Sequence, residues 1–515
     1  MNRYLRNITQ AGRAFGRAVM GSTSGFEAAS RGHQIAGWTE LDSAIDTLMA
    51  SEGDSLRSKS RGLVRKNSWA KNAEEIWVAN MIGTGIKPES LHPDKEVRAL
   101  VQKSWKRWTD EADADGLTDI YGLQALVMRE NFEAGETLIR FRPRFEEDGL
   151  SVPLQLQVIE AEHLSLTHFG NNGGNAIRSG IEFTPFGKRA AYHLYREHPG
   201  LGHMSKGLNP GEMVRVDAAN VIHSFDVLRA GQMRGTPWLA PVMVALYELD
   251  QYVDATLKKQ KISNMFVGWY RGMSDEIAAT LMADARSQNS GETAPTGVAF
   301  GEVQPATILD LSAGGGTLEW STPPDPSSSF PDFVKAMLRM IACGVGVPYT
   351  RLNWDTSDST FASERSELLE FRRRVEQKQF SMMAFQVCRP IWRRWIKDAV
   401  LVGVLPKPRT PAEWNDLYSV EWRTPKWAWV DPLKDVMAAK EAVRCSFTSR
   451  TAQIHELGYD PEQVDAEIAA DNERADRLGI VSDSDPRKTQ DNGGARAASA
   501  DEQPTSGKQG ANKNG

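Results

Sequence analysis

The chain has 515 residues, of which 40% are apolar and 25% are charged, as in an ordinary folded protein with room for about three domains. Its formal net charge of −6 at pH 7 excludes a protein that holds nucleic acid tightly through bulk positive charge. No apolar run approaches the roughly 20 residues that a membrane helix requires, so we expect no membrane partner.

The N-terminal stretch, residues 1–40, is basic and is predicted to be a flexible or partner-binding arm. Four arginines between Arg3 and Arg17 interrupt any apolar run that a signal peptide would need. From Leu41 to Trp108 the apolar residues recur at helical spacing. "GTGIKP", from Gly83 to Pro88, supplies the glycine and the proline that end one of these helices.

Short segments with alternating apolar residues predict antiparallel strands between Tyr121 and Phe225. The predicted strands are Thr137–Phe141, Pro153–Glu160, Lys188–Tyr195 and Asn220–Phe225. Helical spacing then returns, because one apolar stripe recurs every three or four residues. The stripe consists of Leu239, Val242, Leu246, Leu249, Val253 and Leu257.

A mixed stretch from Phe266 to Thr322 contains strand-like runs around a short helix. Asp325-Pro326 is typical of the start of a further helix, which apolar residues from Phe330 to Ile341 continue. Three residues are predicted to stop this helix: Gly344, Gly346 and Pro348. A polar loop, "YTRLNWDTSDSTFASER", then leads into another long helix with apolar residues from Leu368 to Trp395.

Towards the C-terminus, Asp431-Pro432 and Asp460-Pro461 repeat the signature of a capping residue followed by proline. Beyond about Val481 almost nothing is apolar, so a disordered tail is predicted. The three cysteines are far apart and form no C-x-x-C motif, which indicates a reducing compartment and buried thiols. They are Cys343, Cys388 and Cys445.

The stretch "GQMRGT" follows a strand and precedes a helix, as a phosphate-binding loop would. It lacks the lysine of the G-x-x-x-x-G-K-[ST] signature, so we interpret it as structural. The predicted turn leads into the following helix and consists of Gly231, Gln232, Arg234, Gly235 and Pro237. Its glycines permit a sharp bend, and its proline sits beside the helix start, where a missing N–H costs nothing.

The remaining sequence evidence for a metal, nucleic-acid or catalytic site is weak. "EADADG", from Glu111 to Gly116, has carboxylates at alternate positions, but Gly122 stands where a calcium loop needs glutamate. The helix containing "FRRRVEQK" is basic, yet glutamates at three- and four-residue spacings favour ion pairs over nucleic-acid binding. Three histidines spaced by five share no face of a helix or strand: His193, His198 and His203. We predict no catalytic residues, no metal and no cofactor.

Five motifs in one order resemble the lambda-type phage portal proteins. They are "RGLVRKNSWAKNAEEIWVANMIGTGIKP" (Arg61–Pro88), "RSGIEFTPFGKRAAYHLYREHPG" (Arg178–Gly200), "VIHSFDVLRAGQMRGTPWLAPV" (Val221–Val242), "IACGVGVPYTRLNWD" (Ile341–Asp355) and "WVDPLKDVMAAKEAV" (Trp429–Val443). The chain departs from the family pattern at Ala230, where proline is usual, and at Thr360-Phe361, where Asn-Tyr is common.

The resemblance implies an α+β portal fold with an α/β wing, a two-helix stem, an α/β clip, a channel loop and a helical crown. The implied divisions are the arm at 1–40; the wing at 41–240; the first stem helix at 241–266; the clip at 267–326; the second stem helix at 327–348; the channel loop at 349–363; a long wing helix and following strands at 364–430; the crown at 431–480; and the disordered tail at 481–515.

The resemblance also implies a ring, usually of twelve copies, at one capsid vertex. The ring would conduct double-stranded DNA without sequence specificity during packaging and ejection. Implied partners are the chain itself, the large terminase subunit, the major capsid or scaffolding protein and head–tail connector proteins. The implied location is the virion, with the host cytoplasm during assembly. The implied channel-loop residues are Arg351, Asn353, Asp355, Ser357 and Asp358.

Composition agrees with such a conduit, because each phosphate neutralised by lysine or arginine adds salt-dependent adhesion to DNA. The proposed loop carries two aspartates and one arginine among small polar residues. Two alternatives stay open. One is another structural protein of the virion neck, such as an adaptor, and the other is a metal-dependent hydrolase built on Asp113 and Asp115.

Overall fold

The structure is a computed structural model that describes residues 43–201, 211–263, 269–271, 317–319, 330–425, 427, 432–457, 459 and 461–480. Several predictions fall outside these residues. They concern the arm at 1–40, the tail at 481–515, most of the segment at 267–326, Asp325-Pro326 and His203.

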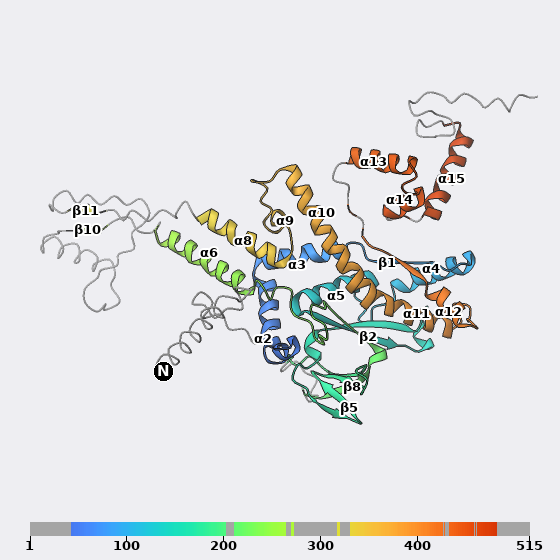
Figure 1. The fold of residues 1–515 in the computed structure, drawn as a ribbon, viewed down its shortest axis with the longest axis horizontal. Helices are drawn as coiled ribbons and strands as arrows, with labels where there is room; N and C mark the ends of the chain where they lie inside the picture. The colour runs from blue at the N-terminus through green and yellow to red at the C-terminus, as the bar shows by residue number, and fades with distance from the viewer. Residues whose placement is uncertain are drawn as a thin grey trace, which may run out of the picture.

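Helices make up most of the described chain (Figure 1). They are α2 (Ile45–Lys66), α3 (Ser68–Met81), α4 (Lys95–Thr109), α5 (Ile120–Ala134), α6 (Met243–Ser263), α8 (Phe330–Val345), α9 (Tyr349–Asn353), α10 (Phe361–Lys378), α11 (Arg389–Leu401), α12 (Pro411–Tyr418), α13 (Pro432–Arg444), α14 (Arg450–Glu456) and α15 (Pro461–Leu478). A π-helical segment, η7 (Gln379–Cys388), joins α10 to α11. Short 3₁₀ turns are η3 (Glu146–Asp148), η4 (Ala161–His163) and η6 (Ala218–Asn220).

The strands form small antiparallel sheets. They are β1 (Lys87–Ser90), β2 (Glu136–Pro143), β3 (Leu154–Ile159), β4 (Gly170–Asn172), β5 (Asn175–Arg178), β6 (Ile181–Phe183), β7 (Arg189–Tyr195), β8 (Met213–Asp217), β9 (Val221–Phe225), β10 (Trp269–Arg271), β11 (Thr317–Glu319) and β12 (Val420–Arg423). One sheet has the order β3-β2-β9 and another the order β4-β5-β6-β7-β8. β1 pairs with β12, and β10 pairs with β11.

The main core lies between the helices and the three-stranded sheet. Its centre is a group of indoles in which Trp105 packs against Trp108, Trp392 and Trp395, with ring centroids 5.0, 5.0 and 5.1 Å away. These rings come from α4 and α11, so helices nearly 300 residues apart share one apolar centre. Burial of such large rings supplies much of the stability of this half of the molecule.

A second, smaller core fills the space between the two larger sheets. Leu138 of β2 packs there with Leu164, Ile181 and Leu194. Its neighbours Ile139 and Phe141 belong to the main core instead. Because successive side chains of a strand point to opposite faces, β2 separates the two cores.

Predictions of the longer strands are confirmed by β2, β3, β7 and β9. The prediction of short strands from Tyr121 onward is wrong for its first part, where α5 forms instead. Nearly every turn of α5 is buried, including the polar Gln124 and Asn131. The buried polar residues and the exposed Leu126 weaken the contrast between the two faces of α5, so the pattern did not reveal it.

Helices predicted from periodicity and caps are confirmed by α6, α8, α10, α13 and α15. α13 and α15 begin at the expected prolines, Pro432 and Pro461. The strand β1 was not predicted, because its partner β12 lies more than 300 residues away. Within the described part of the chain, no helix has both the length and the apolar character needed to cross a bilayer.

Candidate functional site

The helices α6 and α8 lie side by side and project from the body of the molecule (Figure 1). Near the outer end, the Tyr252 ring stacks on Phe330 and meets Phe333 edge-on, with centroids 5.6 and 4.9 Å away. Near the base, Val242 packs against Gly344. Contacts at both ends show that the two helices run antiparallel as one unit.

Gly344 was predicted to help stop α8, and this is wrong. It lies inside the helix, where a Cβ atom would stand 2.3 Å from Val242 Cγ1. The missing side chain therefore allows the two helices to approach closely rather than ending one of them.

The other predicted stop residues have the expected effect. Gly346 has a positive φ of 78°, and the carbonyl of Ala342 accepts hydrogen bonds from Gly346 N at 2.9 Å and Val347 N at 3.1 Å. This left-handed residue ends α8, and Pro348 then caps α9.

The predicted loop at 349–363 is shorter than expected. Tyr349–Asn353 forms α9, and α10 begins at Phe361 behind a capping box of Thr360 and Ser363. The non-helical part is therefore residues 354–360. It opens with Trp354, a non-glycine residue with a φ of 54° whose side chain is 70% exposed.

Two of the predicted loop residues belong to α9 and hold it to the body. The Asn353 side chain accepts a hydrogen bond from Trp69 Nε1 at 3.3 Å. The carbonyl of Arg351 accepts one from Asn72 Nδ2 at 2.9 Å. Both donors lie on α3, so the start of the predicted loop is fixed rather than free.

The remaining predicted loop residues are tied to each other and to α8. Asp355 accepts hydrogen bonds from Ser357 N at 3.0 Å, Ser357 Oγ at 2.6 Å and Tyr349 Oη at 2.9 Å. These bonds, with the nearby ammonium group of Lys335, lower the pKa of Asp355.

The loop carboxylates also have cationic partners. Asp358 forms ion pairs with Lys335 and, at 3.1 Å, with Arg339. Both cations lie on α8. The loop therefore does not present bare negative charge, because its two aspartates face two cations.

The predicted turn before α6 is built around a glutamine. Gly231 has a φ of 81°, which favours glycine. Gln232 Oε1 accepts hydrogen bonds from Leu228 N at 2.9 Å and Arg229 N at 3.2 Å, and its Nε2 donates to the Arg234 carbonyl at 2.8 Å. One buried side chain thus bridges the whole turn.

Arg234 anchors this turn in the protein interior. Its guanidinium donates to Glu136, with Nε 2.9 Å from Oε1, and to the carbonyls of Leu164, Ser165 and Ser179 at 2.7, 3.1 and 2.8 Å. Every N–H of the guanidinium has an acceptor, and neither Arg234 nor Glu136 is exposed. The turn therefore has a structural role, because the Arg234 guanidinium has no free N–H group with which to bind a phosphate.

Glu136 is the centre of this buried anchor. Besides Arg234, it pairs with Arg57 of α2 at 2.6 Å and with His223 of β9 at 3.1 Å, and it accepts the Gly235 N–H at 2.7 Å. We call Arg57, Glu136, His223, Arg234 and Gly235 the buried anchor. It fastens α2, the three-stranded sheet and the base of α6 to one another.

Gly235 and Pro237 fit this joint differently from the prediction. A Cβ on Gly235 would lie 2.0 Å from the carbonyl oxygen of Gly135, so two glycine backbones touch here. Pro237 does not start the helix, since α6 begins at Met243. Among the anchor residues, the sequence singled out Arg234 and Gly235 as turn residues. It gave no signal for Arg57 or Glu136, because the sequence alone does not distinguish a charged residue that the fold buries from one that stays exposed.

Burial disfavours ionised Glu136, but the two guanidinium groups and His223 hold its pKa well below the ordinary value. Burial lowers the pKa of His223 to about 4, although the neighbouring Glu136 opposes this. The unfolded chain therefore binds a proton at this histidine at a higher pH than the folded chain does. Acidification through this window favours unfolding.

We expect His223→Gln to reduce the loss of stability between pH 6.5 and pH 4, the window set by the ordinary and folded pKa values of His223. Glutamine keeps a donor for Glu136 but cannot take up the proton. Urea unfolding at several pH values measures this slope. His198→Gln, at a partly exposed histidine, is the control, and an unchanged slope in His223→Gln would contradict the assignment.

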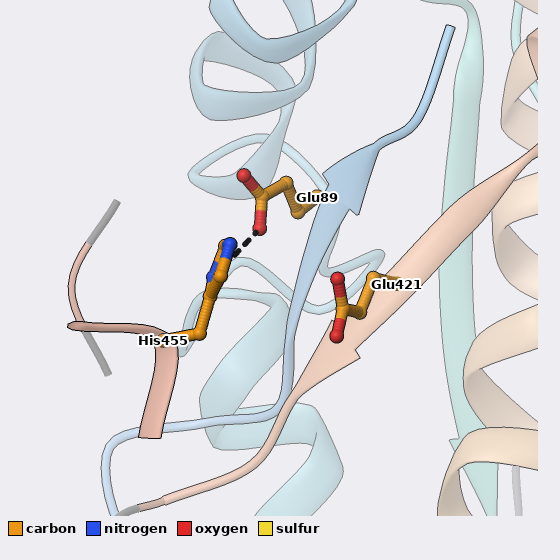
Figure 2. Close-up of side chains that lie close together, drawn as sticks. All are labelled: Glu89, Glu421 and His455. Atoms are coloured by element: carbon orange, nitrogen blue, oxygen red, sulfur yellow. Dashed lines mark ion pairs between the residues drawn. The ribbon is translucent and has the colours of Figure 1, made fainter. Parts of the chain in front are cut away.

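Groups of carboxylates and histidines are better explained by ion pairs than by metals. In Figure 2, Glu89, Glu421 and His455 converge from β1, β12 and α14, with His455 Nδ1 3.7 Å from Glu89 Oε2. The Arg423 guanidinium contacts Glu89 and lies 3.4 Å from His455 Nδ1. A cation thus already contacts two of the three members of this group.

The acidic loop that motivated a hydrolase has a structural use. Asp113 is 5% exposed, and its carboxylate accepts backbone N–H groups of Asp115, Leu117 and Thr118 at 3.0, 2.8 and 3.1 Å. α5 is capped by Asp119 instead, which accepts the Gly122 N–H at 2.7 Å. The loop therefore satisfies its own backbone.

The prediction of buried thiols is wrong for two cysteines. Cys343 and Cys445 are exposed, and Cys388 is buried. Burial raises the pKa of the Cys388 thiol to about 12, so it stays protonated and packs as an apolar group.

The prediction of ion pairs along α10 is confirmed by contacts of Arg373 and Arg374 with Glu370 at 3.7 and 3.9 Å.

Comparisons of the sequence with known proteins agree on one family. Residues 31–379 match the profile of "Phage portal protein, lambda family". The chain is 27% identical to a probable portal protein of Halomonas phage phiHAP-1 over 86% of this chain and 85% of that one. It is 21% identical to portal protein B of Escherichia phage lambda, over 87% and 88%. A chain from the neck of a native GTA particle, computed with C12 symmetry, has a TM-score of 0.44 and 15% identity, over 80% and 94%.

Proposed function

Because the chain belongs to the lambda family of phage portal proteins, we propose that it assembles into a closed ring that conducts DNA. The ring occupies one vertex of the capsid and contains twelve copies on the family expectation. Double-stranded DNA passes through it without sequence specificity, inward during packaging and outward during ejection. The chain has a structural role and no enzymatic one.

The observation that carries this proposal is the projecting pair of α6 and α8. On the inner face of the pair, the side chains of Leu246, Leu249 and Leu338 are buried. Its outer face leaves Val244 and Tyr247 of α6 74% and 56% exposed. Exposed apolar residues one helical turn apart are typical of a helix that packs against a further partner. In a ring, that partner is the same pair of the adjacent subunit.

We assign the pair, with the segments that flank it, to the stem of the portal at 241–266 and 327–348. The segment at 349–363 follows α8 directly and would border the bore. Its aspartates are balanced by Lys335 and Arg339, so the site offers little net charge to a passing phosphate backbone. A surface whose positive and negative charges balance neither binds DNA tightly through counterion release nor repels it strongly.

The other segments follow the portal plan. The wing at 41–240 and 364–430 would face the capsid or scaffolding protein. The clip at 267–326 would meet the large terminase subunit and later the connector proteins, and the crown at 431–480 would close the inner end. This ring would form in the host cytoplasm and remain in the virion.

Electron microscopy of the purified protein tests the proposal. We expect annular particles with α6 and α8 around the bore and the segment at 349–363 bordering it. Monomers under assembly conditions, or rings whose bore is bordered by other segments, would contradict it. Val244→Glu with Tyr247→Glu should abolish the rings and leave a folded monomer. Phe186→Glu, at a side chain 98% exposed in the β6–β7 turn, should leave the rings intact.

The alternatives are less well supported. A different adaptor of the virion neck would not explain the match to the portal family over residues 31–379. A metal-dependent hydrolase would need the Asp113 carboxylate, which three backbone N–H groups already use.

A further inference from the structure

A groove of about 490 Å³ lies between the two larger sheets, at the edge of the smaller core. One wall is formed by β2 and β3, and the opposite wall by β7 and β8. The first wall contributes Arg140, Arg142 and Gln157, and the second contributes Tyr195, Val214 and Val216. The portal proposal gives this groove no role.

The alternation of β2 places both arginines in the groove. On this face of the strand, Glu136 lies in the buried anchor and Leu138 lies in the smaller core. The next residues of the same face are Arg140 and Arg142, where the sheets separate. Residues two apart on a strand stand about 6.6 Å from each other, so the groove carries a pair of regularly spaced cations.

Among the described residues, neither of these cations forms an ion pair with a carboxylate. In the part of the chain that the structure describes, no carboxylate lies within 4.0 Å of either guanidinium group, whereas Arg142 donates to Gln157 Oε1 at 2.9 Å. The carboxylate of Glu160, at the rim, is 3.3 Å from His198 and 4.0 Å from Arg61. Burial and then the like charges of Arg140 and Arg144 lower the pKa of Arg142, and the smaller opposing effect of Asp115 does not cancel them.

We propose that this groove binds an acidic peptide segment of a partner protein, with two carboxylates spaced to meet Arg140 and Arg142. An extended peptide presents side chains i and i+2 on one face at the same spacing as the two arginines. Charge-assisted hydrogen bonds would then replace the mutual repulsion of the cations. The apolar wall of Val214 and Val216 would cover the backbone between the two acids.

The groove does not suit nucleic acid. The strands β5 and β8 lie at the bottom of the view, on the far side of the body from α9 (Figure 1). A space of this volume admits side chains but not a duplex, and its lining has no row of Phe, Tyr or Trp side chains on which successive bases could stack. This inference is independent of the proposed ring.

Fluorescence anisotropy with the full-length protein tests the proposal. The probe is a labelled heptapeptide of alternating serine and glutamate, and its glutamine counterpart is the neutral comparison. We expect the acidic peptide to bind and the neutral one not to bind. Binding should weaken about tenfold or more in Arg140→Gln with Arg142→Gln, and it should weaken with added salt.

The control is Arg444→Gln with Arg474→Gln, which removes the same charge from side chains 60% and 65% exposed on other helices. It should bind like the parent, and circular dichroism should show both variants folded. Absence of binding, equal binding by the groove variant, or equal binding of the neutral peptide would overturn the proposal. Displacement of the acidic peptide by a short DNA duplex, lost in the groove variant, would also overturn it in favour of nucleic acid.

Discussion

Replacing Glu136 with glutamine is expected to lower the free energy of unfolding by about 3–5 kcal/mol, or to prevent folding altogether. The carboxylate is fully buried and faces the guanidinium groups of Arg57 and Arg234. Removing its charge leaves two cations in an interior of low dielectric constant, without the anion that compensates them. Chemical denaturation of the parent and the variant measures the difference.

A matched control separates this effect from the loss of any glutamate. Glu441→Gln removes an exposed carboxylate paired with Arg444 at 3.4 Å, and it should change stability by about 0.5 kcal/mol or less. Arg234→Lys provides a second comparison, because lysine keeps the charge but cannot reach the backbone acceptors that the guanidinium fork reaches. A Glu136→Gln protein as stable as the Glu441→Gln protein would show that the anchor is not the joint we describe.

Replacing Gly235 with alanine is expected to cost about 3 kcal/mol or more, because the new methyl group has no room. Its Cβ would stand 2.0 Å from the Gly135 oxygen and 2.6 Å from the Gly135 carbonyl carbon. Both are backbone atoms, which cannot move aside without disturbing α5 and the start of β2. The thermal unfolding midpoint of the variant, or its yield as soluble protein, measures the effect.

Gly231→Ala is the control at the other end of the same turn. Gly231 has a φ of 81°, but nothing lies within 4 Å of an added Cβ, so only the backbone conformation opposes the change. That substitution should cost about 1 kcal/mol. Equal losses in the two alanine variants would mean that the close approach of Gly235 to Gly135 does not determine the geometry of the turn.

Both predictions concern the joint at the base of the projecting helix pair. If α6 and α8 form the wall of a conduit, forces on that wall are transmitted to the body through Arg234, Glu136 and Arg57. A buried, fully hydrogen-bonded arginine gives a stiff connection, since close-packed interiors deform little. In such a conduit, the turn that resembled a phosphate loop in sequence would have a mechanical role.

Local sequence patterns were sufficient for much of the fold. The apolar stripe of α6, the alternation of β2 and the cap-plus-proline starts of α13 and α15 all depend on residues close together in the chain. So does the left-handed Gly346 after α8. Five ordered motifs also identified the family, which the comparisons confirm.

Only the tertiary structure decided the contacts between distant residues. Glu136 became the centre of the buried anchor because three other elements brought cations and a histidine to it. Asp355 and Asp358 form ion pairs because α8 places Lys335 and Arg339 beside them. β1 formed because β12 supplied its partner, and α5 has a weak amphipathic pattern because the fold buries polar side chains such as Gln124 and Asn131 and leaves Leu126 exposed. Periodicity and capping are short-range effects, whereas burial and ion pairing depend on which segments the fold brings together.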